Sequence, residues 1–202
     1  MLKIIILKFL KLFPYRTYKK IERFQNILFT HWVKDDFAHF GKNSIIHKRT
    51  NISNAKLIEV GNEVVISSCI ITAWSEYLGQ NFSPSIIIGD NCFIGLHANI
   101  SSINRIELKK NVLLGKWVTI IDHDHGDMSL DHLEIPPIRR PLFTKGEIII
   151  EDDVWISDKV TICSNIRIGR GAVIGANSVV TKDVAPYTLV AGCPAKVIKV
   201  LK

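Results

Sequence analysis

The residues of this 202-residue chain best suited to chemistry lie in one short stretch of histidines and acids. There His123 and His125 alternate with Asp122, Asp124 and Asp127. An imidazole titrates near pH ~6.5 and can take a proton from a reacting group, while a nearby carboxylate can orient the ring and favour its cationic form. Two histidines with a carboxylate are also a ligand set for transition metals, and the same residues suit a polar loop held by Asx turns. The scaffold around them decides between these interpretations.

A six-residue repeat organises most of that scaffold. A six-residue period fits neither a helix nor a long alternating strand, but it fits short strands joined by tight corners, with one side chain per strand pointing into a narrow core. Apolar residues recur at this spacing, and small or medium residues follow four positions later: Ile150, Ile156, Ile162, Ile168, Ile174 and Val180, followed by Val154, Val160, Ile166, Ala172, Ser178 and Val184. The same period appears earlier at Phe40, Ile46, Ile52 and Ile58, at Val60, Ile66 and Thr72, at Ile88, Ile94, Ile100 and Ile106, and at Leu108, Leu114 and Ile120.

Three hexads make one triangular coil, and coils stacked at the strand spacing of ~4.8 Å can hydrogen-bond to one another. We therefore expect an all-β fold, a parallel β-helix of about six coils, at 40–57, 60–77, 88–105, 108–125, 150–167 and 168–185. Two-residue insertions at 58–59 and 106–107 reset the phase, and longer excursions interrupt it at 78–87 and 126–149. Glycines directly after inward aliphatics are expected to adopt backbone conformations that side chains resist: Gly89, Gly95, Gly115, Gly169 and Gly175.

The N-terminal segment, residues 1–38, has a different character. The net charge of the chain is +7, and residues 1–23 alone hold seven Lys and Arg against one acid, so the remainder is nearly neutral and no nucleic-acid-binding body is indicated. Residues 1–13 mix apolar residues with lysines up to Pro14, and 17–34 have apolar residues at helical spacing. Two interpretations stay open, a helix lying on an anionic membrane surface and a helix packed on the rest of the protein.

Four widely spaced cysteines indicate neither a disulfide framework nor a zinc site, and they are expected to be small buried hydrophobic residues: Cys69, Cys92, Cys163 and Cys193.

The stretch VWISDKVTICSNIRIGRGAVIGANSVVTKDVAPYTLVAGCPAKVIK, at 154–199, resembles the C-terminal signature of the hexapeptide-repeat acyltransferases. DHDHG at 122–126, with PPIRRPL after it, is most similar to O-acetyltransferases of O-antigen, lipopolysaccharide and capsule assembly, and more distantly to galactoside and maltose acetyltransferases. The resemblance covers roughly 40–199. It implies a left-handed β-helix domain at 39–202 and a homotrimer with acetyl-CoA in the cleft between neighbouring subunits.

The resemblance also implies site residues. The family's catalytic histidine lies five residues after the last aliphatic of its coil; counting from Ile120 gives His125 as general base, with His123 as the alternate. The positions matching the family's acetyl-CoA contacts are Trp155, Asp158, Ala176, Thr181, Lys182, Lys196 and Lys199. Asp158 stands where the family usually has a small residue, and its carboxylate either repels the anionic ligand or accepts an amide hydrogen bond from it. No metal is expected.

The expected function is a cytoplasmic, acetyl-CoA-dependent O-acetyltransferase that acetylates a sugar hydroxyl, free or lipid-linked, in bacterial surface polysaccharide. Residues 1–23 would hold it at the inner membrane face. Two alternatives stay open: an N-acetyltransferase for an amino sugar or small molecule, and a catalytically silent solenoid scaffold.

Overall fold

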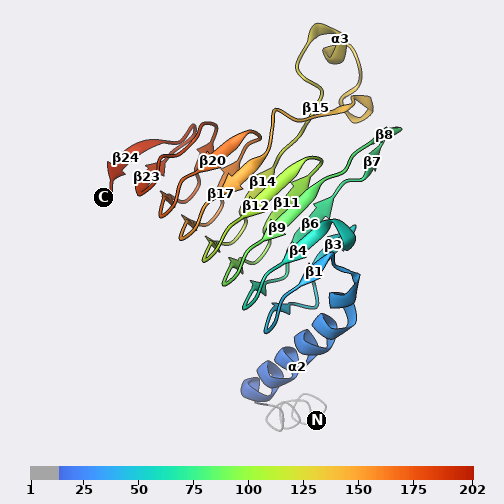
Figure 1. Ribbon diagram of the computed structural model, residues 1–202, viewed down its shortest axis with the longest axis vertical. Coiled ribbons are helices and arrows are strands. Elements are labelled where there is room, and N and C mark those ends of the chain that lie inside the picture. The colour runs from blue at the N-terminus through green and yellow to red at the C-terminus, as the bar shows by residue number, and fades with distance from the viewer. Residues whose placement is uncertain (1–13) are drawn as a thin grey trace, which may run out of the picture.

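The computed structural model describes residues 14–202, so the predicted helix at 1–13 lies outside the described part of the chain. Three parallel sheets form the body (Figure 1). Sheet A holds β1 (His39–Phe40), β4 (Ile58–Val60), β9 (Ser85–Ile88), β12 (Arg105–Leu108), β17 (Ile148–Ile150) and β20 (Ile166–Ile168). Sheet B holds β2 (Ile45–Ile46), β5 (Val65–Ile66), β10 (Phe93–Ile94), β13 (Leu113–Leu114), β18 (Trp155–Ile156), β21 (Val173–Ile174), β23 (Thr188–Ala191) and β24 (Lys196–Val200). Sheet C holds β3 (Asn51–Ser53), β6 (Ile70–Ala73), β11 (Asn99–Ser102), β14 (Thr119–Ile121), β19 (Thr161–Ile162) and β22 (Val179–Val180).

Each coil takes one strand from sheets A, B and C in that order, and its three turns are here called the A–B, B–C and C–A corners. The six strands of sheet C mark six complete coils, numbered 1 to 6 from the N-terminus. The predicted fold class, a left-handed parallel β-helix of six coils, is confirmed. β23 adds a further strand to sheet B, and β24 closes that end by pairing with it antiparallel.

The core is a set of aliphatic columns, one inside each sheet. In sheet B the column is fully buried and in register from coil 1 to coil 6: Ile46, Ile66, Ile94, Leu114, Ile156 and Ile174. In sheet C the expectation fails at one position. Ile71, not Thr72, pairs with Ile52 and Ile100 and is fully buried. The step from Ile66 to Ile71 is one residue shorter than a hexad because the B–C corner of coil 2 is tighter.

The glycines after the inward aliphatics are needed for a different reason from the one predicted. Positive φ angles at the corners fall mostly on other residues, such as Asn91 and Asn111, which tolerate the left-handed region. At Gly89, Gly95, Gly115 and Gly169 an added Cβ would instead lie less than 3.0 Å from backbone atoms of the next coil. These glycines therefore permit close approach of stacked coils.

Helix α2 (Tyr15–Val33) covers the first coil, and its most buried residues are polar. Its buried residues are the polar Asn26 and Thr30. The Thr30 hydroxyl accepts the amide hydrogen of Ile46 at 2.9 Å, and Asn26 Oδ1 accepts that of Lys48 at 3.1 Å. These amides belong to the outer edge of sheet B, which has no further strand to pair with. The helix thus satisfies the open edge with polar side chains.

Phe29 and Val33 of α2 pack against the core, but a second group of its apolar residues faces outward. Ile21, Phe24, Leu28 and Trp32 are 45%, 59%, 53% and 78% exposed. Their helical spacing is confirmed, but they do not pack on the body of the protein. Within residues 14–202 no helix is long and apolar enough to cross a bilayer.

Both long excursions leave the body at the C–A corner. The first, after coil 2, is the hairpin of β7 (Glu76–Tyr77) and β8 (Gln80–Asn81). The second, after coil 4, pairs β15 (Asp124–His125) with β16 (Leu142–Phe143) and carries α3 (Leu130–Leu133) and η3 (Pro137–Arg139). Figure 1 shows the two projecting on the same side. Gln80 joins them, since its side chain bonds both backbone groups of Leu142.

The cysteine expectation holds for two residues of four. All four are free thiols, but only Cys69 and Cys92 are buried, while Cys163 is half-buried and Cys193 is exposed. Burial raises the pKa of Cys69 to about 12.

We expect Gly95→Ala to lower the free energy of unfolding by about 3 kcal/mol, because the new methyl group would collide with the Gly115 carbonyl of the next coil. Gly79→Ala is the control: it has open space and a φ of +80°, so only about 1 kcal/mol of backbone strain is expected. Urea denaturation measures both. Equal losses would contradict the close-approach explanation.

Candidate active site

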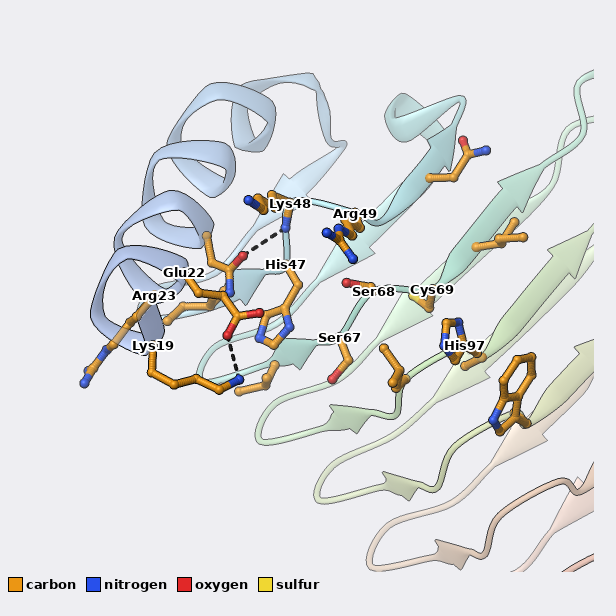
Figure 2. A pocket seen from close by; sticks show the side chains of 18 of the residues that line it. Lys19, Glu22, Arg23, His47, Lys48, Arg49, Ser67, Ser68, Cys69 and His97 are labelled. Carbon is orange, nitrogen blue, oxygen red and sulfur yellow. Dashed lines mark hydrogen bonds and ion pairs between the residues drawn. The ribbon is translucent and has the colours of Figure 1, made fainter. Parts of the chain in front are cut away.

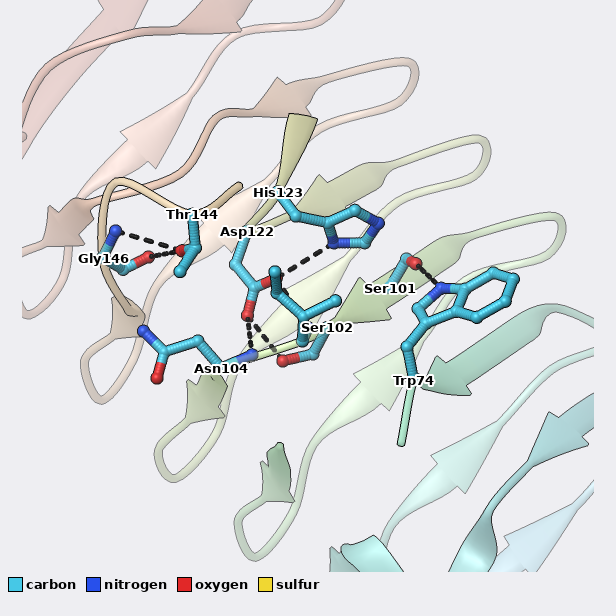
Figure 3. A network of polar contacts seen from close by, with 9 residues as sticks. Trp74, Ser101, Ser102, Asn104, Asp122, His123, Thr144 and Gly146 are labelled. Atoms are coloured by element: carbon cyan, nitrogen blue, oxygen red, sulfur yellow. Dashed lines mark hydrogen bonds and ion pairs between the residues drawn. The ribbon is translucent and has the colours of Figure 1, made fainter. Parts of the chain in front are cut away.

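Asp122 lies at the C–A corner of coil 4, directly after β14, and its side chain is fully buried. Its carboxylate accepts the Ser102 hydroxyl at 2.5 Å and the backbone amides of Ile103 and Asn104 at 2.9 and 3.0 Å (Figure 3). All three donors belong to coil 3, at the end of β11 and in the C–A corner that follows it. The carboxylate therefore ties two coils together at the point where the chain leaves the solenoid.

The Asp122 carboxylate stays ionised in this buried position. Burial, the largest influence, raises its pKa, but the hydrogen bonds from His123, Ser102 and the two amides together outweigh burial and hold the pKa below its usual value. A buried carboxylate with four donors is a fixed negative charge beside the neighbouring imidazole.

That imidazole belongs to His123. Its Nδ1 lies 3.1 Å from Asp122 Oδ1, and its side chain is only 10% exposed. An Nδ1 that donates to a carboxylate leaves Nε2 as the proton acceptor of the neutral ring. Figure 3 shows the ring on the side of sheet C where Trp74 Nε1 donates to the Ser101 hydroxyl at 3.0 Å. An imidazole held by a carboxylate in this way can accept a proton at Nε2.

His125 has a different environment. It lies in β15, pairs with Leu142 and is exposed. The ring of Tyr77 meets it edge-on at 5.5 Å between centroids, with Oη 3.5 Å from Nδ1. Tyr77 Oη donates instead to the Ile138 carbonyl at 2.7 Å. His125 is thus part of the contact between the two excursions.

The rest of the second excursion is braced by its own polar residues. Asp127 lies 2.6 Å from His132 Nδ1, and its hydrogen bonds with Ser129 are the main cause that lowers its pKa. Arg140 donates to the carbonyls of Ile135 and Leu133. Within residues 14–202 no three His, Cys, Asp or Glu side chains gather as metal ligands would.

Most of the residues predicted to contact acetyl-CoA lie on sheet B or its B–C corner. Trp155, Val173, Leu189 and Lys199 follow one another in register across β18, β21, β23 and β24, and Trp155 is 50% exposed. Lys196 lies in β24 as well, opposite Ala191. Ala176 lies exposed at the B–C corner of coil 6.

Thr181 and Lys182 lie at the other edge of sheet C. They follow β22, and parallel pairing of β14, β19 and β22 puts their backbone on the same C–A edge as Asp122. Two strand steps of about 4.8 Å separate them from that residue along the solenoid. One chain therefore brings Thr181 and Lys182 toward His123, but keeps Trp155 and Ala176 on the far side of sheet C.

The carboxylate of Asp158, at the B–C corner of coil 5, has a structural partner. Its Oδ1 accepts the backbone amide of Lys116 in the preceding coil at 2.7 Å. Asp152 does the same for Lys110 at 2.9 Å, so this is a recurring bond between coils. One oxygen of Asp158 thus forms a bond within the fold. Repulsion of an anionic ligand, or acceptance of an amide hydrogen bond from it, is left to the other oxygen.

Sequence reasoning named Asp122 only as one of three acids that could orient an imidazole. It missed Ser102, Tyr77 and Trp74, which complete the surroundings of the two histidines. Ser102 comes from coil 3, and Trp74 and Tyr77 lie where the first excursion begins, so the only available signal was that both excursions interrupt the repeat at the same corner.

The hexad repeat and its β-helix are similar to those of hexapeptide-repeat transferases. Residues 147–182 match the family described as bacterial transferase hexapeptide (six repeats). The chain is similar to the putative lipopolysaccharide biosynthesis O-acetyl transferase WbbJ of Escherichia coli K12, with 35% identity over 118 residues, covering 56% of this chain and 60% of that protein. It is 32% identical over 124 residues to the galactoside O-acetyltransferase of the same organism, covering 59% and 56%. The predicted resemblance is thus confirmed.

Among solved structures, a point mutant of AntD, an N-acyltransferase from Bacillus cereus in complex with dTDP and coenzyme A, superposes with a TM-score of 0.70 at 25% identity, covering 85% of this chain and 89% of that one. The chain spans less than two thirds of the length of the two E. coli relatives.

We expect Asp122→Asn to lower the free energy of unfolding by about 2 kcal/mol at pH 7, because the amide NH2 would face donors in place of a carboxylate. The folded-state pKa of Asp122 is lowered, so its stabilisation is complete above the unfolded value of about 3.9 and is lost as pH falls through the folded value. The gap between wild type and variant should therefore shrink in urea titrations at pH 3. A gap of equal size at both pH values would contradict the assignment.

Proposed function

We propose that this protein is an acetyl-CoA-dependent O-acetyltransferase that acetylates a sugar hydroxyl of a bacterial surface polysaccharide. The observation that carries the proposal is the buried Asp122 beside His123, at the corner where a hexapeptide-repeat solenoid opens into its longest excursion. Similarity to the putative lipopolysaccharide O-acetyl transferase and the galactoside O-acetyltransferase supports the acetyl group and the sugar.

His123 is proposed as the general base, and His125 as a residue that positions the acceptor beside it. An alcohol is a poor nucleophile until its proton leaves, and His123 Nε2 is the atom that can take that proton while Asp122 stabilises the resulting cation. The acceptor oxygen then bonds to the thioester carbonyl carbon, the C–S bond breaks, and the imidazolium returns the proton to the departing sulfur.

The chain's own residues suit the acyl donor. When bound, acetyl-CoA supplies the acetyl group as a thioester. Exposed Trp155 offers an aromatic surface, and Lys196 and Lys199 are exposed cations in β24 that suit the phosphates of acetyl-CoA. Ala176 leaves the B–C corner of coil 6 without a large side chain.

A homotrimer is proposed because the two edges of sheet C carry different parts of the machinery. His123 and Lys182 lie on the C–A edge, while Trp155 and Ala176 lie on sheet B and the B–C corner. In an assembly that sets the C–A edge of one copy against the B–C edge of another, both sets face one cleft. Rotation about a threefold axis repeats that contact three times and closes the ring.

An amino sugar is the second candidate acceptor, favoured by similarity to AntD, an N-acyltransferase. An ammonium acceptor must also lose a proton, so His123 would serve either reaction. A silent scaffold is the remaining alternative, and it predicts no acetyl-CoA binding.

Contact with an anionic membrane surface is proposed for the N-terminal region. Residues 1–23 supply most of the positive charge, and within α2 the exposed apolar stripe Ile21, Phe24, Leu28 and Trp32 is bordered by Arg16 and Lys20. An exposed apolar face with a cationic border is the pattern of helices that lie in the lipid headgroup region.

We expect His123→Ala to lower kcat on the order of 10²- to 10⁴-fold, because the proton acceptor is lost, and His125→Ala to lower it less than tenfold. Release of coenzyme A in the presence of a galactoside acceptor measures both.

Calorimetry should show that both variants bind acetyl-CoA as the wild type does, and light scattering should give the wild type the mass of three chains. A larger loss in His125→Ala would transfer the role of base to that residue, and a protein that binds no acetyl-CoA would be a scaffold.

We expect the full chain to co-sediment with vesicles containing 30 mol% phosphatidylglycerol at low salt, and Phe24→Ser/Leu28→Ser to reduce the bound fraction at least fivefold by removing exposed apolar area. Ile138→Ser is the matched control, because Ile138 is exposed in the second excursion, away from α2. Equal binding by all three proteins, or none by the wild type, would refute membrane contact through α2.

A further inference from the structure

A groove lies between α2 and the B–C corners of the first four coils, on the opposite edge of sheet C from His123 (Figure 2). It has a volume of ≈ 980 Å³, enough for a ligand of several rings. None of the residues proposed to hold acetyl-CoA lines it. Its floor is formed by corner residues of coils 1 to 4, including Arg49, Ser68, His97 and Trp117.

The groove is electropositive. Among the described residues that line it, Glu22 is the one carboxylate, against four cations: Lys19, Arg23, Lys48 and Arg49. Glu22 is paired with Lys19 at 2.7 Å, and Lys48 bonds the Gln25 side chain. Arg49 is exposed and forms no ion pair within residues 14–202. Arg49 and Ser68 both line the groove (Figure 2), so it offers a guanidinium and a hydroxyl to an anionic ligand.

The far end of the groove is aromatic. The rings of His97 and Trp117 lie 4.2 Å apart between centroids at 30°, and Trp117 is 55% exposed. Both residues have a φ of about 61°, in the left-handed region that bulky side chains avoid. The same corner position in coil 6 is Asn177, which suits that region. Two bulky rings held in a strained backbone conformation, in contact with each other and exposed in a cationic groove, indicate a binding role.

We propose that this groove binds a sugar carried on a diphosphate, with Arg49 and Ser68 on the phosphates and the His97–Trp117 pair stacked against a ring of the ligand. The inference rests on the proposed function, for which it names the acceptor class. In the assembly proposed above, the C–A edge of a second copy would bring its own His123 to this B–C edge. The donor contacts at Ala176 and the groove then lie along one edge, on either side of the reacting groups.

The test uses calorimetry with UDP-glucose and flotation with phosphatidylcholine vesicles carrying polyprenyl diphosphate glucose. We expect one of these probes to bind the wild type, and Arg49→Gln and Trp117→Asn each to weaken that binding at least tenfold. Asn suits a φ of about 61°, so the thermal midpoint of Trp117→Asn should be unchanged or higher. This separates loss of the ligand from loss of the fold.

Two variants are matched controls and should bind within twofold of wild type. Lys42→Gln removes an exposed cation of coil 1 at the A–B corner, and Lys159→Asn changes the same corner position as Trp117 one coil beyond the groove.

Binding of UDP-glucose identifies a free sugar nucleotide, and binding of the vesicles alone identifies a lipid-linked sugar. Binding of neither probe, or equal binding by all variants, would overturn the proposal. A protein that binds a sugar diphosphate but no acetyl-CoA would support the groove and refute the enzyme.

Discussion

Hydrogen bonding between successive coils is the constraint on which the whole molecule depends. Each coil must meet its neighbours along all three sheets at strand spacing, so nothing larger than a hydrogen can stand at positions such as Gly95, where the next backbone passes within contact distance. The inward aliphatic columns fill the narrow space that remains. Asp152 and Asp158 reinforce the same contact by accepting amides of the preceding coil.

This constraint explains both ends of the solenoid. A stack of parallel strands leaves an unpaired edge at each end, and buried or half-buried amides there need partners. At the C-terminal end β24 pairs antiparallel with β23. At the N-terminal end α2 places Thr30 and Asn26 against the edge, which leaves its stripe of Ile21, Phe24, Leu28 and Trp32 facing outward. The surface proposed to meet a membrane is thus a consequence of closing the sheet.

The constraint also decides where chemistry can occur. Insertions can leave a stacked coil only at a corner, and both excursions leave at the C–A corner. Where the second excursion begins, the ladder of hydrogen bonds between coils 3 and 4 stops. The amides of Ile103 and Asn104 donate instead to the carboxylate of Asp122. The acid that orients His123 is therefore held by groups that the interrupted ladder releases. The opposite edge of sheet C, free of excursions, leaves room for a groove under α2.

The sequence by itself determined the coils, the corners, the two excursions and the resemblance to hexapeptide-repeat transferases, because a hexad repeat fixes which side chain points inward in every coil. It also marked His123 and His125 as the residues able to move a proton. Only the tertiary structure distinguished their surroundings, since Ser102 and the amides that hold Asp122 come from another coil. Likewise, the pairing of His97 with Trp117 joins residues twenty positions apart that are neighbours only through stacking. The spacing of the apolar stripe on α2 also did not determine that it faces outward. Which face of the helix is buried depends on the open edge of sheet B that the helix covers.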